Sequence, residues 1–166
     1  MRRCNQRPGI ATGVIAVLLL VAPPVGLGFE ISPATDRAHN AGQSLRVAGE
    51  LVTMTVVSAD GGYDNLVSIA SDAPDEGVPC HSVPPGFTVL LGRFATPTEL
   101  VLSLATPVGE VWTTGRGADN RDQVAHARVS VVDPETVRVE WEDLADGGDY
   151  DYNDCVVTLG ITKFVP

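Results

Sequence analysis

The chain has 166 residues, of which 44% are hydrophobic and 5% aromatic, with 11 Lys and Arg against 21 Asp and Glu. Its formal net charge of −10 at pH 7 argues against binding to nucleic acid or to an anionic membrane surface, because the field of an acidic protein repels phosphate. Cationic partners are favoured instead, and the smallest cationic partner is a metal ion.

The first 28 residues have the pattern of a signal peptide. A basic start at Arg2 and Arg3 precedes the uncharged apolar run IATGVIAVLLLVA (residues 10–22), and small residues follow at Gly26 and Gly28. The apolar run is shorter than the roughly 20 residues that span a bilayer. We therefore expect cleavage after Gly28 and a secreted, extracellular or cell-envelope location. Retention of the leader as a membrane anchor is the alternative.

Residues 29–43 are expected to form an irregular N-terminal segment ahead of one domain, residues 44–166. In that domain, runs that alternate or favour β-branched residues are separated by Gly, Pro, Asp and Asn, and none is long and helix-periodic. The pattern predicts an all-β fold, either an antiparallel β-sandwich or a jelly-roll-like single domain. The predicted strands are residues 44–59, 65–71, 87–94, 99–106, 109–114, 126–133, 136–144 and 155–164.

The two tryptophans differ in how clearly the sequence places them. Alternation within TVRVEWEDL puts Val137, Val139 and Trp141 on one face of a strand, so Trp141 is predicted to be a core residue. The sequence leaves open whether Trp112 in GEVWTT is buried or is exposed for binding. His126 in VAHARV is interpreted as a strand residue.

Two cysteines, Cys80 and Cys155, remain once Cys4 leaves with the leader. An even pair in an oxidising compartment most often forms a disulfide, which would stabilise the fold by roughly 4.5 kcal/mol on the chain-entropy model. Two unpaired buried thiols are the alternative. A zinc site is disfavoured, because Cys80 and His81 are adjacent and lack the usual ligand spacing.

The densest acidic stretch, EWEDLADGGDYDYND, has seven carboxylates in its 15 positions, residues 140–154. Within it Asp149, Asp151 and Asn153 alternate with two tyrosines, so a curved loop could point three oxygens at one centre, and Asp154 adds a fourth. Hard oxygen donors without His or Cys select calcium or magnesium, and calcium accepts six to eight oxygens in irregular geometry. The stretch is therefore predicted to bind calcium. A solvated acidic turn is the alternative.

The stretch WEDLADGGDYDYNDCVVTL resembles the signature of the bacterial family known as domain of unknown function 4114. LGRFATPTELVLSLATP and ADNRDQVAHARV resemble earlier parts of the same family, so the similarity runs from about Thr88 to Leu159. The resemblance implies a secreted bacterial protein with a β-sandwich fold and, from its acidic motif, calcium binding. It adds two residues to the candidate metal ligands, Glu142 and Asp143. The motif positions present are Glu142, Asp143, Gly147, Gly148, Asp149, Asp151, Asn153 and Asp154.

This sequence departs from the family pattern at two places. Ala145-Asp146 stands where the family more often has a neutral residue and a third Gly, which alters the expected turn. Cys155 follows the Asn-Asp pair, so a disulfide to Cys80 would anchor the acidic loop here.

These features favour a non-catalytic exported module in which calcium holds the C-terminal acidic loop and shapes a binding or adhesive surface. An extracellular polysaccharide or a surface protein is the expected partner. The alternatives are an extracellular carbohydrate-active hydrolase that uses two carboxylates and a structural envelope protein without a ligand. Serine chemistry is disfavoured, because there is no G-x-S-x-G motif and His39, His81 and His126 show no triad signature. No catalytic residue is predicted.

Overall fold

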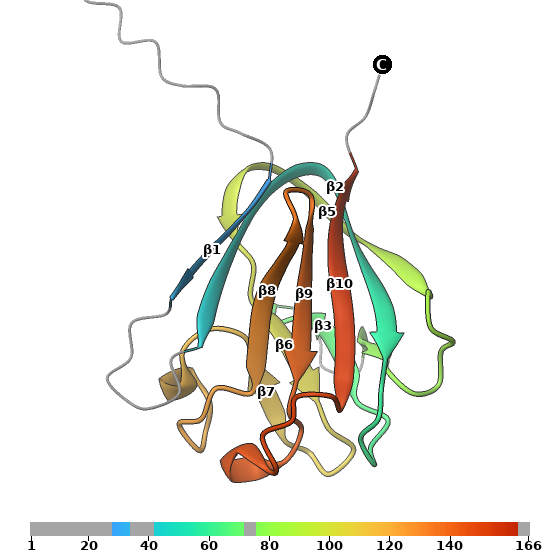
Figure 1. The fold of residues 1–166 in the computed structure, drawn as a ribbon, viewed down its shortest axis with the longest axis vertical. Coiled ribbons are helices and arrows are strands. Elements are labelled where there is room, and N and C mark those ends of the chain that lie inside the picture. Colours follow the sequence, from blue (N-terminus) through green and yellow to red (C-terminus); the bar gives the residue numbers. More distant parts are fainter. Residues whose placement is uncertain (1–27, 34–41, 72–75, 163–166) are drawn as a thin grey trace, which may run out of the picture.

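The computed structural model describes residues 28–33, 42–71 and 76–162. Across these ranges the chain forms antiparallel strands and two short 3-10 helices, η2 (Gly117–Asp119) and η3 (Ala145–Gly147). The predicted all-β fold is confirmed (Figure 1). Neither helix in the described ranges is long and apolar enough to cross a membrane. The leader up to residue 27 lies outside the described residues.

The larger sheet has the strand order β1-β2-β10-β9-β8, and β5 also pairs with β2. Residues 52–55 of β2 pair with both β10 and β5, so β2 lies between these two strands. The sheet curves until it is nearly closed, with the first half of β2 beside β8 (Figure 1). Its strands are β1 (Gly28–Pro33), β2 (Gln43–Ser58), β5 (Thr88–Glu99), β8 (Ala127–Asp133), β9 (Thr136–Trp141) and β10 (Cys155–Thr162).

The smaller sheet packs against the larger one and has the order β4-β3-β6-β7. One apolar core receives side chains from both sheets, as in a β-sandwich. Trp141 of the larger sheet and Trp112 of the smaller sheet are both fully buried. The predicted burial of Trp141 is confirmed, and the open question about Trp112 is settled in favour of the core. The strands of the smaller sheet are β3 (Leu66–Ile69), β4 (Val78–Pro79), β6 (Leu102–Ala105) and β7 (Val111–Thr113).

The segment expected to be irregular, residues 29–43, begins instead with a strand. In β1, Phe29 and Ile31 pack against the core, whereas Glu30 and Ser32 are exposed. Four alternating residues are a weak sequence signal, and β1 gains its order from pairing with β2 rather than from its own pattern. Residues 34–41 lie outside the described part of the chain.

One end of the sandwich is closed by the loop that joins β9 to β10. Cys155, the first residue of β10, pairs with Trp141, the last residue of β9, so residues 142–154 form the connection of a hairpin. Cys155 is also joined by a disulfide to Cys80, which follows β4 in the smaller sheet. The predicted disulfide is confirmed, and it ties the two sheets together beside the acidic loop.

Candidate metal site in the loop between β9 and β10

The acidic loop is tightly coiled and turns back over its own first residue. Positive φ angles occur at Asp146, Gly147, Gly148, Tyr150 and Tyr152, a backbone region that glycine reaches without strain and other residues seldom adopt. At Gly148 a Cβ atom would lie 2.2 Å from Glu142 Oε1. Glycine is therefore required at position 148 for the loop to close over the Glu142 carboxylate.

The Glu142 side chain lies at the centre of this coil and is only 1% exposed. Its two oxygens accept hydrogen bonds from the backbone N–H groups of Leu144 at 3.2 Å and Tyr150 at 3.1 Å. Burial raises the pKa of Glu142 to about 7, and the nearby charges of Asp154 and Asp149 raise it as well. The ionised form of Glu142 is thus destabilised unless a cation is close.

Asp143 and Asp154 are held side by side next to Glu142. The backbone N–H of Asp143 donates to Asp154 Oδ2 at 2.8 Å, and Asn65 Nδ2 donates to Asp143 Oδ2 at 2.7 Å. Burial also raises the pKa of Asp154, and the charges of Asp143 and Asp151 add to that effect. Within the described ranges, no Lys, Arg or His side chain forms an ion pair with these carboxylates.

The carboxylates form two groups that share Glu142. In each group one oxygen per residue lies within 4.8 Å of the others, a spacing that could hold a metal ion. The first group is largely buried, whereas Asp149 and Asp151 of the second are exposed. The inner group is Glu142, Asp143 and Asp154, and the outer group is Glu142, Asp149 and Asp151.

Asn153, the sixth predicted ligand, supports Asp151. Its side-chain N–H donates to Asp151 Oδ2 at 2.6 Å, and its backbone N–H donates to Asp151 Oδ1 at 3.0 Å. The Asn153 carbonyl accepts a hydrogen bond from the backbone N–H of Asp60 at 3.1 Å. The structure thus gathers five of the six predicted ligands into the two groups and places Asn153 beside them, as a donor to one of their carboxylates.

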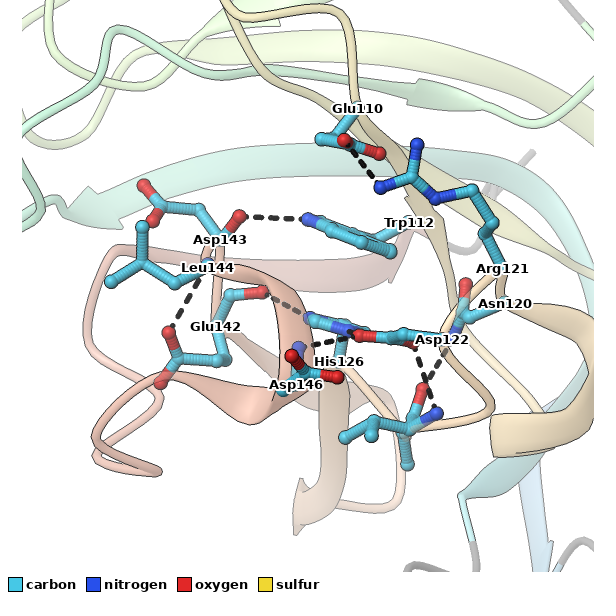
Figure 2. Close-up of polar contacts among 12 residues, drawn as sticks. Glu110, Trp112, Asn120, Arg121, Asp122, His126, Glu142, Asp143, Leu144 and Asp146 are labelled. Atoms are coloured by element: carbon cyan, nitrogen blue, oxygen red, sulfur yellow. Dashed lines mark hydrogen bonds and ion pairs between the residues drawn. The ribbon is translucent and has the colours of Figure 1, made fainter.

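Two stacked rings lie beneath the start of the loop and fix its backbone (Figure 2). The rings of Trp112 and His126 have centroids 3.8 Å apart and planes inclined by 5°. Trp112 Nε1 donates to the carbonyl of Asp143 at 2.8 Å, and His126 Nδ1 lies 2.9 Å from the carbonyl of Glu142. Buried side chains from β7 and from the approach to β8 therefore orient the two loop residues that begin the site.

His126 also contacts a partly buried carboxylate, because its Nε2 lies 2.9 Å from Asp122 Oδ2. Burial by itself would raise the pKa of Asp122, but hydrogen bonds from His126, Val124 and Asp146 outweigh it and lower the pKa. Both ring nitrogens of His126 therefore lie beside oxygens, Nδ1 beside the Glu142 carbonyl and Nε2 beside the Asp122 carboxylate. Figure 2 shows Asp122 and Asp146 meeting beside the His126 ring.

Several residues of this region were not predicted from the sequence. Asn65 stands outside the segment that resembles the family motif, and nothing in its neighbourhood signals a role. Asp122 and His126 do fall in ADNRDQVAHARV, one of the stretches that carried the resemblance. That resemblance could have marked them as partners of the loop, whereas the alternation pattern alone marked only a strand.

The fold and the site together define an all-β, sandwich-like domain with a partly buried acidic cluster at one end. The model of the family described as "Domain of unknown function (DUF4114)" matches residues 110–162. The resemblance noted in the sequence is confirmed over β7, β8, β9, the acidic loop and β10, although the match begins later than the expected Thr88. Searches of the curated proteins and of the solved structures found no match to this chain.

Proposed function

We propose that this protein is an exported, non-catalytic β-sandwich domain that binds calcium through the loop between β9 and β10. The bound ion fixes the shape of the loop, and the loop surface serves binding or adhesion at an extracellular polysaccharide or a surface protein. The leader-like N-terminus and the cysteine pair support export, since disulfides persist in oxidising compartments.

The observation that carries the calcium proposal is the environment of Glu142. A carboxylate that is 1% exposed and close to other acidic groups is costly to ionise, yet the described residues offer it backbone N–H groups and no cationic side chain. A divalent cation would supply the missing positive charge. All donors in the two groups are oxygens, which match calcium better than zinc or copper.

The geometry gives less support to the alternative of a glycoside hydrolase. The raised pKa of Glu142 would suit a general acid, but its side chain is buried beneath the loop rather than open to a substrate. A hydrolase also needs two carboxyl groups on opposite sides of the bond it cleaves. Here the carboxylates lie together on one loop and within one small cluster.

Thermal unfolding of residues 29–166 with calcium and with chelator tests the proposal. With a dissociation constant of order 0.1 mM and about 1 mM free calcium, binding stabilises the folded state by roughly 1.4 kcal/mol. For a domain of this size the melting temperature should rise by roughly 3 to 5 °C. Asp133→Ala, a charge change in β8 away from the site, should leave the shift intact. An unchanged melting temperature in millimolar calcium would refute the proposal, and a shift with zinc alone would replace calcium by another metal.

A further inference from the structure

Asn65 is a buried residue of the smaller sheet that reaches the acidic loop. It lies immediately before β3 and is 0% exposed, and its backbone carbonyl accepts a hydrogen bond from the N–H of Cys80 at 2.8 Å. Its side-chain Nδ2 donates to Asp143 Oδ2 at 2.7 Å. Asn65 therefore brings the smaller sheet into contact with a loop that belongs to the larger one.

The side-chain oxygen of Asn65 is in a different situation from its nitrogen. Asn65 Oδ1 is buried and has no hydrogen-bond partner among the described residues. Buried polar atoms without partners are rare, because they lose hydration and gain nothing in return. The oxygen and nitrogen of an amide share one carbon, so Oδ1 is at most one amide width further from Asp143 Oδ2 than Nδ2 is.

We propose that Asn65 is a ligand of the metal ion and that the ion occupies the inner group, where Asn65 Oδ1 joins the carboxylates of Glu142, Asp143 and Asp154. This inference rests on the proposed calcium binding and assigns it to one of the two groups. An ion in this position links the two sheets, because Asn65 precedes β3 whereas the carboxylates lie on the hairpin of β9 and β10.

The chemistry of the inner group fits this assignment. Asparagine side-chain oxygens are common calcium ligands, and three carboxylates with one amide make an all-oxygen donor set. One ion would satisfy the unpartnered oxygen and also neutralise carboxylates that have no cationic partner in the described part of the chain. Among the described residues the outer group has no comparable buried, unpartnered oxygen, since Asp149 and Asp151 are exposed and accept hydrogen bonds from loop N–H groups.

Calcium titration calorimetry of three variants tests the assignment. Asn65→Leu removes the oxygen at similar volume and should weaken calcium binding by at least about tenfold. Asn65→Asp keeps an oxygen at the same place and should retain binding, which separates loss of a ligand from loss of the fold. Ser68→Ala, a buried change in β3 whose hydroxyl pairs with Ser103, should bind calcium like the unmodified protein.

Substitutions in the outer group should have little effect on calcium binding. Asp149→Asn and Asp151→Asn should change the calcium affinity by less than about threefold, because neither residue belongs to the inner group. Terbium bound in place of calcium should retain few water ligands, as measured by its luminescence lifetime in H₂O and D₂O. An exposed outer site would leave several waters on the ion, and that result would overturn the assignment.

The failure of this inference is distinguishable from the failure of the proposed function. If titration of the unmodified protein shows no heat of calcium binding, calcium binding itself is refuted. If it binds calcium and Asn65→Leu binds equally well, a buried water rather than an ion serves Asn65 Oδ1 and only the present assignment is overturned. Equal losses in Asn65→Leu and Asp149→Asn would also overturn it.

Discussion

Gly61 lies directly against the side chain of Asp154. A Cβ atom at position 61 would be 2.5 Å from Asp154 Oδ1 and 2.9 Å from its Cβ. The neighbouring Asp60 donates its backbone N–H to the carbonyl of Asn153 at 3.1 Å, so the chain that follows β2 packs along the end of the acidic loop. Backbone from a distant part of the sequence therefore limits where the Asp154 carboxylate can point.

Gly61→Ala is expected to disturb both the fold and the site. The added methyl group must displace Asp154, and overpacking of this kind typically costs about 1 to 3 kcal/mol. Calcium affinity should fall as well, because Asp154 leaves the inner group. Gly62→Ala is the matched control, since no atom lies within 4 Å of a Cβ atom at that position. Urea unfolding and calorimetry of the two variants give the comparison, and equal behaviour would refute the proposed contact.

His126→Phe should destabilise the domain by about 2 kcal/mol. The phenyl ring can keep the stacking on Trp112, but it leaves the Asp122 carboxylate without the ring nitrogen that faces it. Removing one partner of a largely buried hydrogen bond is costly, because the other partner is left unsatisfied. Denaturant unfolding measures the loss directly.

A surface ion pair provides the control for that variant. Arg121 and Glu110 are 2.6 Å apart, but the Arg121 side chain is 72% exposed. Exposed pairs contribute about 0 to 1 kcal/mol, so Arg121→Gln should change stability by less than about 1 kcal/mol. If the two substitutions proved equally costly, the His126–Asp122 contact would contribute no more to stability than an exposed one.

The stability of the calcium-free protein should fall as pH rises through the range from about 4.5 to 7. Burial raises the pKa of Glu142 from 4.5 to about 7, so within this window the folded state binds more protons than the unfolded state. Asp154 acts in the same direction. Urea unfolding in chelator at pH 5.5 and pH 8 should show the loss, and Glu142→Gln should reduce it.

Calcium affinity should show the opposite pH dependence to the stability of the calcium-free protein. Protons compete with the ion for the same carboxylates, so calcium affinity should rise from pH 5.5 to pH 8. Comparison with Glu142→Gln isolates the contribution of Glu142 to this dependence. A Glu142→Gln protein with the same pH profile as the unmodified one would rule out Glu142 as the source.

The sequence predicted those features of the fold that are encoded within one segment. The alternation in β9 predicted that Val137, Val139 and Trp141 face the core. The pair of cysteines that remains after the leader predicted the disulfide. Trp112 could not be placed, because β7 has only three residues and its pattern is too short to show a period. Long strands with a regular pattern could be placed from the sequence, whereas the position of a short strand depends on the strands that it pairs with.

The candidate site was predicted in composition and only partly in arrangement. The sequence suggested that alternate residues of the loop would point to one centre, and Asp149 and Asp151 do come together there with Glu142. Asn153 instead presents its N–H₂ group to Asp151. Asn65 is 78 positions from Asp143, and no local pattern can reveal a contact that only the packing of two sheets creates.

Reduction of the disulfide should weaken both stability and calcium binding, because the bridge is attached to both sides of the inner group. Cys155 follows Asp154 directly, and the N–H of Cys80 binds the carbonyl of Asn65 at 2.8 Å. On the chain-entropy model, losing a bridge of sequence separation 75 costs roughly 4.5 kcal/mol. A looser loop must also be ordered when the ion binds, which lowers the affinity.

Calorimetry of Cys80→Ser/Cys155→Ser against the oxidised protein measures this coupling. We expect the variant to bind calcium several-fold more weakly at a temperature where circular dichroism shows that it is still folded. Digestion without reductant should yield one peptide pair linked through Cys80 and Cys155, which verifies the starting state. A folded double variant with undiminished calcium affinity would mean that the contacts of Asn65 and Asp154 hold the site without the bridge, and that the disulfide serves the fold alone.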